Sequence, residues 1–257
     1  MTDEPDHLIF CLSQPSLSAR DEGRLLAALH RAARAHCAQP VTVVRLEGSG
    51  TDLARALRQA RDVGATHVRV MPVGFPMAAN IAAWLPGAVA HVAATEGGEM
   101  RITLAEPPAP EEAAAALVPL ALEARATDAA TLRPTLGSPG WQFLPDFDTH
   151  ILVCTGPRCA FRGAGTLLAR LKARLAAAGL SDRCLTTATG CLYPCNQGPL
   201  IALYPQGAWY VVPDEAALDR IVTEVIGAGR DAPDLRLAER PGSRRAPLSP
   251  PNHRRSE

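Results

Sequence analysis

The chain has 257 residues, which is enough for two ordinary domains, and its 26 basic residues balance its 26 acidic ones. Zero net charge and a pI near 7.0 argue against nucleic acid or an anionic membrane as a partner. The opening MTDEPDHLIFCL lacks the basic and apolar segments of a secretion signal, and no apolar run is long enough to span a bilayer. We therefore expect a cytoplasmic protein that does not associate with membranes.

Short apolar runs alternate with helical patterns in the first 130 residues, and this order favours an α/β fold with an open, mostly parallel sheet. A further helix is expected over 111–130, kinked at Pro119. We interpret residues 1–130 as the first domain. The expected strands are 7–12, 41–46, 67–73 and 100–108, and the expected helices are 22–36, 51–63 and 80–94, the last broken near Pro86.

Residues 131–148 are rich in proline and glycine and show no hydrophobic period, which is typical of a linker. The order β-α-β-β-β-α then predicts a second α/β domain with a mixed sheet over 149–229. From residue 230 to residue 257 the chain is polar and rich in arginine, so we expect a disordered basic tail. The expected strands are 150–154, 184–189, 199–205 and 208–213, and the expected helices are 163–178 and 214–227.

Two cysteine pairs lie in the predicted second domain, where strands give way to glycine-rich loops. Cys154 and Cys159 form a C-x4-C motif, and Cys191 and Cys195 form a C-x3-C motif. In a cytoplasmic protein, cysteines are more often thiols or metal ligands than disulfides. Adjacent strands would bring both loops to one edge of the sheet, and four thiolates can ligate a 2Fe-2S cluster.

Three other interpretations of the four thiols stay open. A structural zinc site would also use four cysteines, although zinc ribbons commonly show C-x2-C. A thioredoxin-type dithiol would need C-x-x-C after the first strand. The third alternative is four unliganded thiols. Cys184 at a strand start, Cys11 on the first strand and Cys37 at a helix end are interpreted as small core side chains.

The segments VCTGPRCAFRGA and TGCLYPCNQGPLIALYPQGAWY, with a leucine-rich helix between them, closely resemble the thioredoxin-like 2Fe-2S ferredoxins. These are related to the small ferredoxin subunit of bacterial NADH dehydrogenases. The resemblance covers about 148–228. It implies a 2Fe-2S cluster, one-electron transfer between a redox donor and a redox acceptor, and, as in many members, a homodimer. The implied cluster and metal ligands are Cys154, Cys159, Cys191 and Cys195.

Residues 7–122 resemble the small class II chelatases, in particular the sirohydrochlorin cobalt chelatases of cobalamin synthesis. The resemblance rests on the leading strand and its loop, on VRLEGSGTDLARALRQARDVGATHVRVMPV and on ITLAEPP. That family uses histidines after the first and third strands to bind metal and to accept protons. Here no histidine lies between Leu8 and Ser18, and Asn80 stands near the second expected position. Because an amide is a poor ligand and no base, we expect an inactive, chelatase-like domain without catalytic residues.

Polar residues remain at the carboxyl ends of the predicted parallel strands, where open α/β sheets bind ligands. Glu47 follows the second strand, Ser13 and Gln14 follow the first, and Asn80 follows the third. These four side chains could line a pocket that binds a tetrapyrrole without inserting a metal.

The leading prediction is a 2Fe-2S electron carrier fused to an inactive chelatase-like domain, serving tetrapyrrole or cobalamin metabolism. The chain is then more an electron carrier than a catalyst. Two alternatives stay open. One is an active sirohydrochlorin cobaltochelatase regulated by its iron-sulfur cluster, and the other is a non-enzymatic tetrapyrrole-binding or scaffold protein with a structural cluster.

Overall fold

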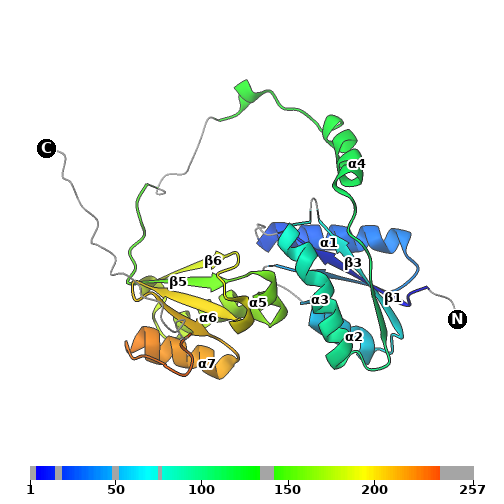
Figure 1. The fold of residues 1–257 in the computed structure, drawn as a ribbon. Coiled ribbons are helices and arrows are strands. Elements are labelled where there is room, and N and C mark those ends of the chain that lie inside the picture. Colours follow the sequence, from blue (N-terminus) through cyan, green and yellow to red (C-terminus); the bar gives the residue numbers. More distant parts are fainter. Residues whose placement is uncertain (1–3, 15–18, 48–51, 75–76, 134–141, 238–257) are drawn as a thin grey trace.

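Two separate β-sheets, each with its own hydrophobic cluster, make up the fold (Figure 1). The computed structural model describes residues 4–14, 19–47, 52–74, 77–133 and 142–237. The expected α/β class is confirmed, with a parallel first sheet and a mixed second sheet. No helix within these ranges combines the length and the apolar character needed to cross a bilayer.

The first sheet has the strand order β2-β1-β3-β4, and every pairing in it is parallel. The central strand β1 is an unbroken apolar run because helices cover both faces of a parallel sheet. On it, Ile9 and Cys11 are completely buried. The strands are β1 (His7–Leu12), β2 (Val41–Arg45), β3 (His67–Val73) and β4 (Arg101–Leu104).

The described part of the chain that forms this sheet also contains four helices: α1 (Ala19–His36), α2 (Leu53–Asp62), α3 (Ala79–Glu96) and α4 (Pro110–Leu122). Asp52 caps α2 by accepting a hydrogen bond from the Arg55 backbone N–H at 2.7 Å, while the alternative cap, Thr51, lies outside the described residues.

Helix α3 runs through Pro86, so the predicted break there is wrong. Pro86 removes one backbone donor, but Ile81 and Leu85 before it and Val89 after it are all buried against the sheet. This packing on both sides of the proline keeps the helix continuous. As a result, one rigid element carries both Asn80 and Trp84.

Helix α4 ends at Leu122, which corrects the expectation of a helix up to residue 130. None of the helix's own side chains is buried, and Leu120 and Leu122 are 65% and 82% exposed. Short helices depend on tertiary packing for their stability, and α4 has no buried side chain that would stabilise additional turns. A single 3₁₀ turn, η1 (Ala129–Thr131), follows.

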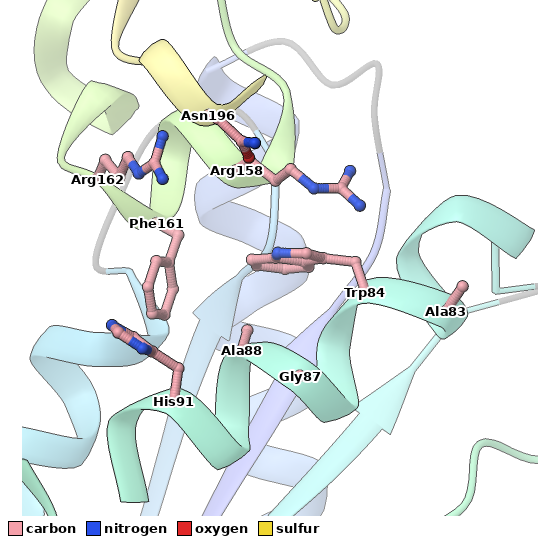
Figure 2. A pocket seen from close by; sticks show the side chains of 9 residues that line it. All are labelled: Ala83, Trp84, Gly87, Ala88, His91, Arg158, Phe161, Arg162 and Asn196. Atoms are coloured by element: carbon pink, nitrogen blue, oxygen red, sulfur yellow. The ribbon is translucent and has the colours of Figure 1, made fainter. Parts of the chain in front are cut away.

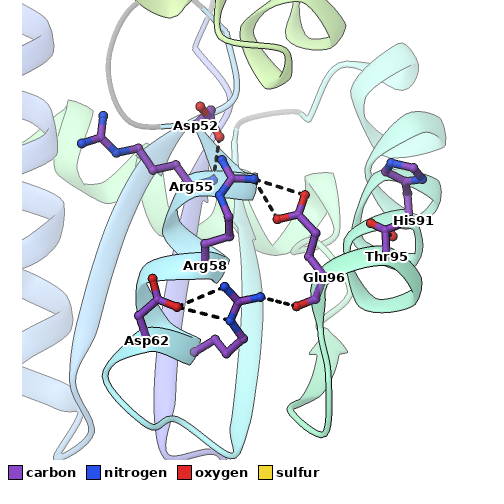
Figure 3. A network of polar contacts seen from close by, with 8 residues as sticks. Asp52, Arg55, Arg58, Asp62, His91, Thr95 and Glu96 are labelled. Atoms are coloured by element: carbon purple, nitrogen blue, oxygen red, sulfur yellow. Dashed lines mark hydrogen bonds and ion pairs between the residues drawn. The ribbon is translucent and has the colours of Figure 1, made fainter.

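Polar contacts tie the end of α3 to α2 (Figure 3). The Arg58 guanidinium donates to both carboxylate oxygens of Glu96, at 2.9 and 3.2 Å, and Arg61 donates to the Glu96 carbonyl oxygen at 2.7 Å. Arg61 also pairs with Asp62. These bonds join the C-terminal end of α3 to α2.

The second sheet has the order β6-β5-β7-β8, with β5 parallel to β6 and antiparallel to β7. The expected β-α-β-β-β-α order is present, and Leu167, Leu171 and Leu175 bury one face of the main helix. The strands are β5 (Thr149–Cys154), β6 (Cys184–Thr189), β7 (Leu200–Tyr204) and β8 (Ala208–Val211). The helices are α5 (Pro157–Phe161), α6 (Leu167–Ala177) and α7 (Glu215–Arg220), with the π-helical η5 (Ile221–Gly227) and the 3₁₀ turns η2 (Ala164–Thr166), η3 (Ser181–Arg183) and η4 (Cys195–Gln197).

The segment just after η5 folds back onto β8, whereas disorder was expected from residue 230 onward. Ala232 is completely buried, Tyr210 forms a β-bridge with Arg236, and the Leu237 backbone N–H donates to the Trp209 carbonyl oxygen at 2.7 Å. An apolar residue inside a polar stretch therefore anchors the chain here. The rest of the expected tail, 238–257, lies outside the described residues.

Candidate metal centre

The two cysteine motifs lie at one edge of the second sheet. Cys154 ends β5 and pairs in register with Thr189, the last residue of β6, so the loops after both strands start side by side. The second loop carries Cys191 and leads to Cys195, the first residue of η4. Cys159 lies in the short helix α5, which corrects the expectation that a loop holds it.

The four sulfur atoms are arranged as two pairs. The Sγ atoms of Cys191 and Cys195 lie 3.1 Å apart, and the thiols of Cys154 and Cys159 share a hydrogen bond. All seven cysteines are free thiols. Within the described ranges, no group of three or more His, Cys, Asp or Glu side chains is arranged to hold a metal ion. Two neighbouring pairs suit a centre with two irons, in which each iron takes two thiolates.

Two glycines let the backbone approach these sulfurs. A β-carbon on Gly156 would lie 3.1 Å from the Cys191 Cα, and one on Gly198 would collide with the Cys159 Sγ. The Cys154 sulfur also accepts hydrogen bonds from the backbone N–H groups of Leu192 and Gly156. Amide donors aimed at sulfur favour the negatively charged form of a metal-thiolate centre.

The hydrogen bond between Cys154 and Cys159 shifts the pKa values of the two thiols in opposite directions. It lowers the pKa of Cys154 to about 6, against the opposing effect of burial. The same bond, followed by burial, raises the pKa of Cys159. Burial, and then the bond with Cys191, raises the pKa of Cys195. Cys154 is therefore the thiol best prepared to act as a thiolate, the form that binds metals.

The remaining cysteines lie elsewhere. Cys11 is completely buried in the first core, and burial raises its pKa. Cys184 starts β6 at the opposite end from Thr189 and packs against the second core, and burial raises its pKa too. Cys37 follows α1 and is half-buried.

A second polar site occupies the carboxyl edge of the first sheet. The Ser13 hydroxyl donates to Glu47 Oε1 at 2.9 Å, as the grouping of these residues in the sequence suggested. Burial raises the pKa of Glu47, although Ser13, Arg45 and the Gln14 backbone N–H oppose this effect. Glu47 is only 8% exposed, and its Oε2 has no hydrogen-bond partner among the described residues.

Sequence reasoning missed the buried ion pair beside this site. Arg45 Nη1 lies 3.0 Å from Glu22 Oε2, and the Arg45 guanidinium also donates to the Gln14 carbonyl oxygen at 2.7 Å. The sequence carried one signal for this pair: Arg45 lies at the end of the mostly apolar strand β2, and a buried arginine needs an acidic partner.

Glu47 and Asn80 line a cavity of about 410 Å³. Its other wall comes from the second sheet unit, including Gly156, Thr189 and Cys191. Two of the four predicted pocket residues, Glu47 and Asn80, therefore share one cavity with the second cysteine loop, whereas Ser13 and Gln14 are not among its lining residues. No local sequence pattern indicated this second wall.

Helices α3 and α5 hold the two sheet units together (Figure 2). The Trp84 and Phe161 rings meet edge to face with their centroids 5.7 Å apart, and the Arg158 guanidinium lies 5.8 Å from the Trp84 ring centroid. Phe161 also packs against the core of the first unit. Arg162 donates to the Cys195 carbonyl oxygen at 2.7 Å, so this interface adjoins the cysteine loops.

Comparison with curated proteins finds 2Fe-2S ferredoxins. The chain is 32% identical over 69 residues to the 2Fe-2S ferredoxin of Clostridium pasteurianum, a stretch that covers 24% of this chain and 68% of the relative. It is 31% identical over 80 residues to a protein of Priestia megaterium assigned as a 2Fe-2S ferredoxin, covering 31% of this chain and 62% of that protein's length. A third relative is the 2Fe-2S ferredoxin of Aquifex aeolicus, 26% identical over 99 residues, with 35% of this chain and 89% of the relative covered. No family model matches the chain.

Comparison with solved structures finds similarity to two kinds of protein. One is the thioredoxin-like 2Fe-2S ferredoxin of Aquifex aeolicus, at 28% identity and a TM-score of 0.34, covering 38% of this chain and 98% of that one. The other is the sirohydrochlorin chelatase of Bacillus subtilis subspecies spizizenii in complex with cobalt, at 23% identity and a TM-score of 0.35, covering 40% of this chain and 43% of that one.

Proposed function

We propose that this chain, which belongs to the 2Fe-2S ferredoxins, is a one-electron carrier whose cluster is held by Cys154, Cys159, Cys191 and Cys195. The ferredoxin domain is residues 149–229, joined through a linker over 131–148 to a first domain over 1–130. The observation that carries the proposal is the meeting of two thiol pairs at one sheet edge, with the Cys191 and Cys195 sulfurs 3.1 Å apart.

The chain's own residues prepare this site in three ways. Strands β5 and β6 fix the two loops side by side. The amides of Gly156 and Leu192 donate to the Cys154 sulfur, and Gly198 leaves room for Cys159. When bound, a 2Fe-2S cluster supplies reversible one-electron chemistry. The amide donors would favour its reduced, more negative state.

A potentiometric titration of the anaerobically purified protein, followed by visible absorbance, tests electron transfer. We expect a single reversible one-electron wave. A cluster that cannot be reduced and reoxidised would instead have a structural role and would contradict the proposal.

A second function, tetrapyrrole binding by the first domain, is favoured by the cavity that Glu47 and Asn80 line, and by the Oε2 of Glu47, which has no hydrogen-bond partner among the described residues. We propose that this domain has no chelatase activity, because Asn80 stands where a histidine would be needed. Tetrapyrrole or cobalamin metabolism is then the setting. Absorbance titration with sirohydrochlorin tests binding, and a cobalt-insertion assay that gives product would contradict the proposed inactivity.

The proposal also includes a cytoplasmic location and a homodimer. Seven free thiols fit a reducing compartment. Fractionation of cells checks the location, and sedimentation equilibrium checks the dimer, with a monomer as the contradicting result.

A further inference from the structure

A second cavity, of about 430 Å³, lies between α3 and α5 (Figure 2). This volume falls within the usual range for small-molecule sites. The α3 wall carries two rings, Trp84 and His91, and three small residues, Ala83, Gly87 and Ala88. Residues three or four positions apart share one face of a helix, so the small residues leave the space beside the two rings open.

The opposite wall is cationic. Arg158 lies on α5, Arg162 follows that helix, and Asn196 of η4 adds an amide. The described lining residues include no aspartate or glutamate. In the sequence, Arg158 and Arg162 are the only Asp, Glu, Lys or Arg residues of 151–169, and 184–213 has none. An anion in this cavity would therefore be attracted by both arginines and opposed by no described lining carboxylate.

Both guanidiniums keep N–H donors for a ligand, because neither has a carboxylate partner in the described part of the chain. Arg158 lies 5.8 Å from the Trp84 ring centroid, a cation–π contact that uses none of its N–H donors. Arg162 donates from Nη1 to the Cys195 carbonyl oxygen at 2.7 Å, which leaves its other N–H groups. Five other arginines of this sheet unit do pair with carboxylates: Arg170, Arg174, Arg183, Arg220 and Arg236.

The two guanidiniums fit a compact dianion. Arg158 and Arg162 are four residues apart, a spacing that places side chains on one face of a helical turn, so both can reach one group. Guanidinium donors match phosphate and carboxylate oxygens in pairs. A phosphate monoester carries a charge of about −1.5 to −2 at pH 7 and balances two arginines, whereas a single carboxylate balances one. The Trp84 and Phe161 rings offer an apolar surface for an attached organic group.

We infer that this cavity binds a small phosphate monoester, with Arg158 and Arg162 on the phosphate and Trp84 beside the organic group. The cavity adjoins the second cysteine motif, because Arg162 bonds to the Cys195 carbonyl oxygen and Asn196 follows Cys195. A bound dianion next to a cluster disfavours an added electron, so the ligand binds more weakly to the reduced protein. This coupling rests on the proposed electron carrier, whereas the site itself does not.

Isothermal titration calorimetry of the full-length, anaerobically purified protein with phenyl phosphate, in a phosphate-free buffer, tests the site. We expect saturable binding that is tighter than that of inorganic phosphate or of the dicarboxylate phthalate. Arg158→Gln and Arg162→Gln should each weaken it by at least about tenfold, because hydrogen bonds to a charged group are lost. Arg230→Gln is the control, since it removes the same charge from an exposed position outside the lining.

Three results would overturn the inference. Wild type that does not bind phenyl phosphate has no such site. Phthalate that binds as tightly as phenyl phosphate would refute the assignment to a phosphate. An equal loss of affinity in Arg230→Gln would show that the overall charge of the protein, and not this cavity, attracts the anion.

Two substitutions at Gly87 test the same cavity and leave both arginines in place. A β-carbon on Gly87 meets no atom within 4 Å among the described residues, so either side chain is accommodated. Gly87→Asp adds a carboxylate to the lining, and Gly87→Asn adds an uncharged group of nearly the same shape. We expect Gly87→Asp to weaken binding by about tenfold or more and Gly87→Asn to retain most of it. Equal affinities in the two variants would contradict an anion site here.

The coupling to the cysteine motif has its own readout. A potentiometric titration in saturating phenyl phosphate should give a lower midpoint potential than one without it, by about 59 mV if reduction weakens binding tenfold. An unchanged potential would overturn the coupling and leave the binding site intact. Failure of the ligand-free titration to show a reversible wave would instead contradict the electron-carrier proposal.

Discussion

The backbone of Gly198 lies against the side chain of Cys159, so closely that a β-carbon at position 198 would collide with the Cys159 sulfur. The two residues belong to different cysteine motifs: Cys159 lies within α5, and Gly198 lies after Cys195, just before β7. A similar contact joins Gly156 to Cys191. Each loop thus supplies a glycine for a cysteine of the other, so the two loops are packed as one unit.

Gly198→Ala should disturb this unit. The added methyl group must displace the Cys159 side chain or the loop, and overpacking of this kind typically costs about 1–3 kcal/mol. We expect lower stability and less bound iron, measured by thermal unfolding and iron analysis. Gly190→Ala is the matched control, because a β-carbon there meets no atom within 4 Å among the described residues. Equal iron content in the two variants would contradict the packing described here.

Trp84→Ala should loosen the contact between the two sheet units. It removes the edge-to-face pair with Phe161, worth about 0.5–1.5 kcal/mol, and the Arg158 contact, worth about 0.5–1 kcal/mol. We expect a larger radius of gyration in small-angle X-ray scattering. Phe143→Ala serves as the control, since this ring is 82% exposed. An unchanged radius for Trp84→Ala would show that other contacts hold the units together.

Glu47→Gln should stabilise the ligand-free protein at neutral pH. Burial raises the pKa of Glu47 above its ordinary value of 4.5, so the folded state favours the protonated form. The resulting penalty is absent below the unfolded pKa, grows as the pH rises towards the folded pKa, and is complete above it. The variant's gain in melting temperature should therefore be larger at pH 7 than at pH 4. A gain of the same size at both pH values would indicate that protonation of Glu47 is not its cause.

Cys191→Ser should lower the iron content and bleach the visible spectrum, because a proposed cluster ligand is lost. Cys37→Ser is the control, since Cys37 is half-buried at the end of α1, in the other sheet unit. Its iron content and spectrum should match those of wild type. If both variants retained iron equally, the ligand assignment would be wrong.

The strands that position the cysteines were predictable from the sequence because their signals are local. The apolar run ending at Cys154 and the β-branched segment 184–189 match β5 and β6 closely. Helix α5 was missed because its five residues, Pro157–Phe161, are too few to show a helical period. The break expected at Pro86 was wrong because burial of α3 against the sheet outweighs one lost hydrogen bond.

The cavity was only half predictable. Glu47 and Asn80 line it and follow parallel strands, and such positions meet at one edge of a sheet. The contribution of Cys191, and the packing of Trp84 that supports it, depend on contacts between segments far apart in the sequence. Neither hydrophobic period nor motif spacing carries information about such contacts.

Iron and sulfide analysis of the anaerobically purified protein, with EPR spectra before and after reduction by dithionite, tests the central claim most directly. A cluster held by the two cysteine pairs predicts about two irons and two sulfides per chain. It also predicts no EPR signal as isolated and an S = 1/2 signal after reduction. Zinc in place of iron, or an iron centre that stays EPR-silent after reduction, would contradict the assignment of this chain as an electron carrier.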